Sequence, residues 1–195
     1  MVDKKAKKRE SILLASLELF SKNGFHKTTI PDIAKMLNMS VGNLYNYFKS
    51  KDLLAKEAIR YTSEYLGQKI KEINSLDISA KEKIRKIVEV YFKTAKEKPQ
   101  MIEYFLRVYL SNREVFSDEC AGMLCVSSFV TEIMIFFDEA VEKKELRDQD
   151  FFSAFGLFMG YLGGMVFLKG ENILPKDIEE YIDDISTNIY NALKA

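Results

Sequence analysis

Two helix-start signals stand close together in the N-terminal quarter of the sequence, and their spacing constrains the fold most. Thr29 precedes Asp32 by three residues with Pro31 between them, a pattern typical of a helix N-terminus. Ser40 can cap a second helix soon afterwards, and Asn38 tolerates the left-handed conformation that ends the first. Two helices joined so tightly must cross at a steep angle. The spacing therefore predicts a helix-turn-helix.

Apolar residues recur at helical spacing along most of the chain. With 47% hydrophobic residues but only 9 Gly and 3 Pro, the sequence has few helix breakers and no strand candidate. We expect an all-α fold of about nine helices. It comprises a three-helix helix-turn-helix domain in residues 1–50 and a helical body in residues 51–195, which a long helix from Lys51 to about Asn74 connects.

The segment after Ser40 carries different side chains on different sides of a helical wheel. With Leu44 as the reference, Phe48 and Val41 fall on the same side and are predicted to face the core. The side chains on the other side of the helix are short and rich in amides, and the Asn side chain can pair bidentately with adenine. Phenol hydroxyls at its flanks would reach phosphates on either side of a groove. The outward side consists of Gly42, Asn43 and Asn46, with Tyr45 and Tyr47 as flanks.

Charge is distributed unevenly, although the formal net charge is zero. Residues 1–51 hold ten basic residues against four acidic ones, which indicates a polyanionic partner for this part of the chain. Lys51 stands in the first turn of a helix capped by Ser50, where a cation is unfavourable unless a phosphate docks there. The leading segment KKAKKRE is either an arm along a DNA backbone or a disordered, solubilising tail.

The stretch TTIPDIAKMLNMSVGNLYNYFKSKDLL, residues 28–54, resembles the TetR family of bacterial transcriptional regulators. The similar positions are Thr28-Thr29, Ile33-Ala34, Leu44-Tyr45, Tyr47-Phe48 and Lys49-Ser50-Lys51, and SLELFSKNGF before them is also similar. The resemblance covers about the first 55 residues. It implies phosphate contacts from Thr28 and Thr29, a major-groove face and a backbone clamp. The implied DNA-binding set is Thr28, Thr29, Ser40, Val41, Gly42, Asn43, Tyr45, Asn46, Tyr47 and Lys51.

The sequence departs from the family's pattern at three points. Asn38 stands where the family often has glycine, and Tyr47 stands where histidine is common. The outward side of the third helix has no arginine, so the usual bidentate contact to guanine is absent from it. We therefore expect contacts to adenine and to thymine methyl groups rather than to guanine.

Aromatic and methionine side chains crowd the helical body. Each one is best explained as core, but together such side chains can line an adaptable apolar pocket. The resemblance implies a pocket between the fourth and eighth helices that holds a small apolar effector. Arg107 either orients an acidic ligand group or extends to solvent. The candidate ligand-binding residues are Tyr61, Tyr65, Phe92, Met101, Phe105, Arg107, Phe129, Ile133, Phe155 and Met159.

The uncharged stretch Phe151–Leu168 is 18 residues long, the lower limit for a membrane span. Three of its glycines share one helical face, a pattern that also dimerises membrane helices. Acidic residues precede the stretch and no second span accompanies it, so we favour a buried helix of a soluble dimer. The resemblance places the dimer interface on the last two helices. The candidate interface residues are Gly156, Gly160, Gly164, Ile178, Ile182, Ile185 and Ile189.

Together with what the resemblance implies, these patterns predict a cytoplasmic, homodimeric repressor that a small apolar effector releases from a near-palindromic operator in double-stranded DNA. The alternative is a helical, membrane-associated or protein-binding adaptor. An enzyme is not expected: His26 is the single histidine, and no nucleophile-base constellation, phosphate loop or metal spacing is present. No cofactor and no metal are predicted. Cys120 and Cys125 point to different helical faces and are predicted to be reduced, and the N-terminus lacks the pattern of a secretory signal.

Overall fold

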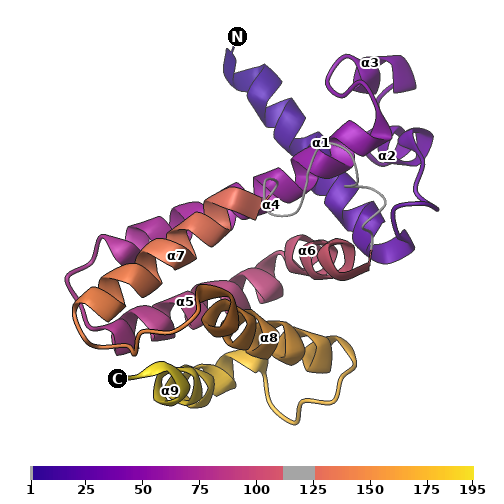
Figure 1. Cartoon of the computed structure of the whole chain (residues 1–195). Helices are drawn as coiled ribbons and strands as arrows, with labels where there is room; N and C mark the ends of the chain where they lie inside the picture. Colours follow the sequence, from indigo (N-terminus) through magenta and orange to yellow (C-terminus); the bar gives the residue numbers. More distant parts are fainter. Residues whose placement is uncertain (1, 112–125) are drawn as a thin grey trace. The chain divides into compact units, whose positions relative to one another are not determined.

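The computed structural model describes residues 2–111 and 126–195, with only the backbone of residues 2, 3 and 107–111. In these residues nine α-helices and one short 3-10 helix form, and no strand does (Figure 1). The all-α prediction is therefore confirmed. Cys120 and Cys125 lie outside the described residues. The helices are α1 (Val2–Asn23), α2 (Ile30–Met36), α3 (Val41–Tyr45), α4 (Lys51–Asn74), α5 (Ala80–Glu97), α6 (Pro99–Ser111), α7 (Ser127–Glu142), α8 (Phe151–Gly170) and α9 (Ile182–Leu193), with the 3-10 helix Ile178–Tyr181 before α9.

The chain divides into two compact units that do not follow the order of the sequence. Unit 1 comprises Met1–Ser63 and Lys98–Val126, and unit 2 comprises Glu64–Glu97 and Ser127–Ala195. Helix α4 contributes its first half to unit 1 and its second half to unit 2. The domain limits predicted from the sequence, 1–50 and 51–195, stay a prediction.

Unit 1 is built around helix α1. Its apolar face is buried, including Leu13, Leu17 and Phe20, and Gly24 ends it in the left-handed conformation with φ of 80°. Helix α6 packs on α1, where the ring of Tyr104 stacks on that of Phe20 with centroids 5.3 Å apart. The N-terminal helical region therefore shares its core with a helix that follows about 75 residues later in the chain.

Unit 2 has helix α5 as its central element. Its buried face includes Ile84, Ile87 and Tyr91, and α9 packs along it. Ion pairs reinforce this packing at the surface, because Arg85 Nε lies 2.7 Å from Asp183 Oδ1 and Lys96 pairs with both Asp177 and Glu179. Such exposed pairs contribute little to stability, so burial of the apolar face is the main stabilising term.

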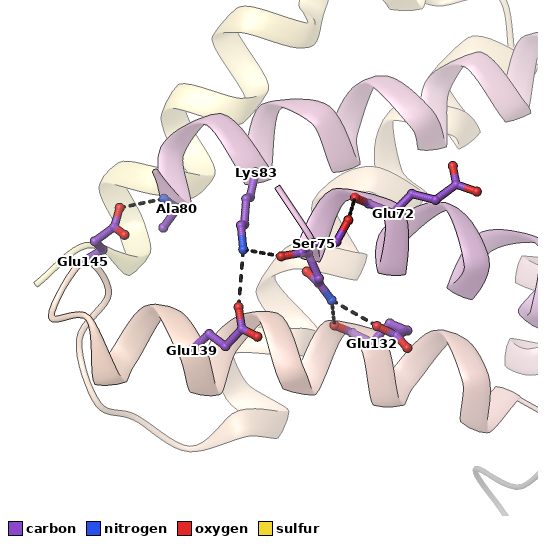
Figure 2. A network of polar contacts seen from close by, with 8 residues as sticks. Glu72, Ser75, Ala80, Lys83, Glu132, Glu139 and Glu145 are labelled. Carbon is purple, nitrogen blue, oxygen red and sulfur yellow. Dashed lines mark hydrogen bonds and ion pairs between the residues drawn. The ribbon is translucent and has the colours of Figure 1, made fainter. Parts of the chain in front are cut away.

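A polar network joins the end of α4 to α5 and α7 within unit 2 (Figure 2). The buried Lys83 donates from Nζ to the carbonyl of Asn74 at 2.8 Å and to Glu139 Oε2 at 3.3 Å. Asn74 Nδ2 donates in turn to the carbonyl and the carboxylate of Glu132. Glu145 Oε2 accepts from the backbone amide of Ala80 at 2.6 Å, at the start of α5. Helix ends that lack backbone partners are thus satisfied by side chains.

Helix α8 is apolar on several sides and remains largely exposed in the single chain. Phe152 is 61% exposed and Phe167 is 62% exposed. Among the described residues it is the one helix long and apolar enough to span a membrane, by length and composition only. Only 22% of its apolar window is buried, so the predicted burial of this helix is not achieved within one chain.

Candidate DNA-binding site

Helix α2 begins at the capping box that the sequence predicts. Thr29 Oγ1 accepts from the backbone amide of Asp32 at 3.3 Å, and Asp32 Oδ2 accepts from the Thr29 amide at 2.9 Å and from its hydroxyl at 2.6 Å. These bonds hold the pKa of Asp32 below its ordinary value. The hydroxyl proton of Thr29, a predicted phosphate contact, is therefore directed at Asp32.

The neighbouring Thr28 lies inside unit 1 rather than on its surface. Its side chain is fully buried, and its hydroxyl is directed at the carbonyls of Gly24 at 2.9 Å and Leu19 at 3.1 Å. Thr28 thus fixes the turn between α1 and α2. A phosphate contact through its hydroxyl would require this buried group to leave its position.

The turn between α2 and α3 follows the predicted geometry. Asn38 takes φ of 49°, and the amide of Met39 donates to the carbonyl of Ala34 at 2.9 Å. Ser40 Oγ then accepts from the amide of Asn43 at 3.2 Å and caps α3. A left-handed residue followed at once by an N-cap makes the turn short, as a helix-turn-helix requires.

Helix α3 presents most of its side chains to solvent. Leu44 and the following Phe48 are buried and hold the helix to unit 1. Val41 is 37% exposed, which corrects the prediction that it faces the core. The helix has only five residues, and Val41 is the first of them, so it projects beyond the edge of the core. A Cβ at Gly42 would meet no atom of the described chain within 4 Å.

The polar side chains of this segment have no partner in the part of the chain that the structure describes. Asn43 and Asn46 are exposed, Tyr45 is 42% exposed and Tyr47 is partly exposed. None of the four side chains makes a hydrogen bond to another described residue. Two amides and two phenols are therefore free to bind an external partner.

Lys51 is bound to unit 1 by its own ammonium group. Nζ donates to the carbonyls of Phe25 at 3.0 Å and Thr28 at 3.2 Å, and lies 4.2 Å from the centre of the Phe25 ring. An ammonium carries three donors, so one remains for a phosphate. Sequence reasoning missed the bond to Phe25, because it joins residues 26 positions apart.

Arg9 is a second residue of this region that the sequence did not single out. Its guanidinium lies 4.9 Å from the centre of the Phe48 ring and pairs with Glu57 Oε2 at 2.5 Å.

Tyr61, which the sequence analysis names as a candidate ligand residue, instead donates its hydroxyl to Glu10 Oε1 at 2.6 Å. The contacts of Arg9 with Glu57 and of Tyr61 with Glu10 tie α1 to α4, close to residues 41–48, which we call the recognition segment.

The other candidate ligand residues fall into separate groups. Met101 and Phe105 are buried in unit 1, whereas Phe92, Phe129 and Ile133 are buried in unit 2. Within unit 2, three more are partly exposed: Tyr65, Phe155 and Met159. The side chain of Arg107 lies outside the described residues. The predicted apolar pocket therefore stays a prediction.

A polar hollow of about 410 Å³ lies between α4 and α7 in unit 2. None of the candidate ligand residues lines it. Its lining consists of Glu64, Gly67, Gln68, Lys71, Ser127, Ser128, Thr131 and Glu132.

The candidate dimer residues divide into exposed and buried ones. Gly156, Gly160 and Gly164 are exposed, and a Cβ on any of them would meet no described atom within 4 Å. The isoleucines differ, because three of them are buried inside unit 2 and only Ile182 is partly exposed. The buried three, which serve the chain's own core, are Ile178, Ile185 and Ile189.

Comparisons with known proteins agree with this architecture. The family described as "Bacterial regulatory proteins, tetR family" matches residues 12–58, which include α2 and α3. The chain is 27% identical over 183 residues to the HTH-type transcriptional regulator YerO of Bacillus subtilis, covering 90% of this chain and 62% of that protein. It is 29% identical over 157 residues to the negative regulator IcaR of Staphylococcus aureus, covering 77% and 80%.

Solved structures show the same fold. The regulator FadR of Bacillus subtilis in complex with stearoyl-CoA superposes with a TM-score of 0.79 at 18% identity, over 93% of this chain and 97% of that one. A regulator from Marinobacter aquaeolei superposes with a TM-score of 0.80 at 17% identity, over 99% and 98%.

Fold and site together define a helical regulator with an N-terminal helix-turn-helix. Residues 12–58, which hold the helix-turn-helix, match the model of the TetR family of bacterial transcriptional regulators, and the chain as a whole is similar to HTH-type transcriptional regulators. Its relatives are regulators and not enzymes, in agreement with the prediction from the sequence.

Proposed function

We propose that the protein is a homodimeric, cytoplasmic repressor that binds a near-palindromic DNA operator through α3 and is released by a small apolar effector. The observation that carries the proposal is the set of unpartnered polar side chains on and after α3. Exposed amides without an internal partner lose no bond when they turn to base edges. The helix before them, α2, is fixed by its own capping box, so α3 is held at a defined angle.

In this proposal Asn43 and Asn46 read base edges in the major groove, and the exposed Val41 contacts a thymine methyl group. Tyr45 and Tyr47 donate to phosphates on either side of that groove. The remaining donor of Lys51 adds a phosphate contact. The buried Thr28 supports the site without touching DNA.

The proposed dimer uses the open face of α8. Gly156, Gly160 and Gly164 permit a close approach of a second helix, and the exposed Phe152 and Phe167 would become buried there. A two-fold axis relates the two copies of α3, so the operator has two half-sites about one helical turn or a multiple of it apart.

The effector is proposed from chemistry alone. Several buried aromatic and methionine side chains of the body are of the kind that line apolar pockets. The fold neighbour FadR was solved with stearoyl-CoA, which supports an effector with an apolar chain. An effector releases DNA only if it binds the two conformations of the dimer with different affinity, by about 1–3 kcal/mol.

Selection from a pool of random duplexes tests the DNA-binding proposal directly. The wild type should enrich a near-palindrome, and Asn43→Ala or Asn46→Ala should relax its preference by about 1–3 kcal/mol at the contacted base pairs. The matched control is Gln68→Ala, an exposed amide of unit 2, which should leave the preference unchanged. A wild type that enriches no sequence would contradict the proposal.

Sedimentation of the purified protein tests the proposed dimer. Gly160→Leu fits the open surface of the single chain, so it should fold and sediment as a monomer. A wild-type monomer, or a Gly160→Leu variant that remains a dimer, would contradict the proposed α8 interface.

A further inference from the structure

The basic segment at the N-terminus is part of a helix. Helix α1 runs without interruption from Val2 to Asn23, so the segment is neither an extended arm nor a disordered tail. Between Val2 and Arg9 it contains five basic residues and one acidic residue. The basic groups are therefore held at fixed positions along a helix.

Contacts to α4 hold this end of α1 beside the recognition segment. Arg9 pairs with Glu57 and lies over the ring of Phe48, three residues after the end of α3. The next residue, Glu10, accepts from the hydroxyl of Tyr61. Figure 1 shows the start of α1 and helix α3 extending from the same side of α4, within unit 1.

Three lysines extend beyond this anchored point. Lys4 and Lys5 are exposed and Lys8 is partly exposed, and none of their ammonium groups pairs with a carboxylate in the described part of the chain. Lys4 precedes Lys8 by four residues and Lys5 precedes it by three, so like charges repel along the helix. Cations in the first turn also oppose the helix dipole. A polyanion would supply the opposite charge that these three ammonium groups lack in the described part of the chain.

We infer that Lys4, Lys5 and Lys8 bind the phosphate backbone of the duplex that α3 reads, outside the groove occupied by α3. This inference rests on the proposed function. Arg9 lies beside the recognition segment, and with a rise of 1.5 Å per residue Lys5 lies about 6 Å further along the helix axis. That advance corresponds to about two base pairs along one strand. The lysines thus extend the DNA contact surface and add no sequence preference of their own.

The test compares two triple variants of equal net charge. One carries Lys4→Gln, Lys5→Gln and Lys8→Gln, and the control carries three exposed lysines of α5 in unit 2 changed to Gln. The probe is a fluorescein-labelled duplex of mixed sequence, titrated between 50 and 200 mM NaCl. The slope of log affinity against log salt should fall in magnitude by about 0.9 for each phosphate that the α1 variant no longer binds. The α5 control, which should keep the wild-type slope, changes Lys81, Lys86 and Lys93.

The outcomes separate this inference from the proposed function. If the α1 variant keeps the wild-type slope while Asn43→Ala still relaxes sequence preference, the inference is wrong and the proposed function stands. If the slope falls equally in both triple variants, net charge and not contact explains the effect, and the inference fails. If wild-type protein binds vesicles of phosphatidylglycerol but not the duplex, the lysines serve a membrane surface and both proposals fail.

Discussion

The recognition segment in unit 1 and the junction of α4, α5 and α7 in unit 2 use polar side chains in opposite ways. At the junction, the ammonium of Lys83 and the amide nitrogen of Asn74 are bonded within the chain (Figure 2). On and just after α3, the side-chain amides of Asn43 and Asn46 make no hydrogen bond to any described residue. Polar groups that are bonded internally fix structure, whereas exposed groups without partners can bind something else.

The same distinction applies inside the recognition region itself. The resemblance implies phosphate contacts for both Thr28 and Tyr45, yet the hydroxyl of Thr28 is buried on backbone carbonyls and Tyr45 is exposed. The family pattern alone does not separate residues that touch DNA from residues that support them. The hydrogen bonds within the chain distinguish the buried hydroxyl of Thr28 from the exposed one of Tyr45, and the proposed DNA contacts follow that distinction.

The largest effect is expected at the junction. Lys83→Met keeps most of the buried aliphatic volume but removes the bonds to the carbonyl of Asn74 and to Glu139. An unsatisfied buried carbonyl should lower the free energy of unfolding by about 1–3 kcal/mol. Urea unfolding followed by circular dichroism measures the change.

Two further variants sharpen this result. Lys81→Met, on the exposed side of the same helix, should change stability by less than about 0.5 kcal/mol. Glu139→Gln should have a small effect, because the Glu139 side chain is 43% exposed and water can replace its partner. Equal losses for Lys83→Met and Lys81→Met would show that the network does not stabilise the junction.

The next effect tests the close approach of α4 and α7. A Cβ on Gly67 would lie 2.9 Å from the carbonyl carbon and oxygen of Ser128, so Gly67→Ala must displace one backbone from the other. Such overpacking costs about 1–3 kcal/mol, against which better helix propensity recovers up to about 1. Gly170→Ala, at the end of α8 and outside the proposed dimer residues, has open space, so it should be neutral or stabilising in the same unfolding experiment. A stabilising Gly67→Ala would contradict the close contact.

The local helix signals were predictable from the sequence, since they depend on residues a few positions apart. The caps by Thr29 and Ser40 and the left-handed Asn38 all occur as predicted. Each requires only the backbone of one turn and one side chain, so tertiary packing does not override it.

The long-range contacts were not predictable in this way. Lys51 bonds to Phe25, and α6 packs on α1, because residues far apart in sequence meet in the folded unit. Val41 shows a different failure, because a helical wheel assumes that the core extends along the whole helix. On a helix of five residues the first residue has no neighbouring turn to bury it.

Two matched capping boxes allow a comparison between the units with a smaller effect. Thr29 caps α2 with Asp32, and Ser79 caps α5 with Glu82 through the same pattern of bonds. Thr29→Ala and Ser79→Ala should each lower the free energy of unfolding by about 1 kcal/mol. Only Thr29→Ala should also weaken DNA binding, since α2 holds α3 in place. Equal DNA affinities for the two variants would contradict that role.

Acid titration checks the same boxes. Hydrogen bonds from Thr29 and Ser79 hold the pKa values of Asp32 and Glu82 below their ordinary values. The stability contributed by each carboxylate is therefore present above its ordinary pKa and is lost as pH falls through the lowered pKa. In Thr29→Ala and Ser79→Ala this part of the acid dependence should be reduced.

The smallest effect at neutral pH is expected for buried phenols without partners. The hydroxyls of Tyr91 and Tyr104 are buried and make no hydrogen bond in the described part of the chain, and burial raises both pKa values. Changing either residue to Phe removes a hydroxyl that contributes no hydrogen bond, so the free energy of unfolding at pH 7 should stay the same or rise slightly.

Above about pH 10 the unfolded chain releases the phenol proton while the folded chain keeps it. Stability should then fall by about 1.4 kcal/mol per pH unit for each tyrosine, and Tyr91→Phe should make that fall less steep. A marked loss of stability in Tyr91→Phe at pH 7 would show that the Tyr91 hydroxyl makes a hydrogen bond in the folded protein, which contradicts the prediction.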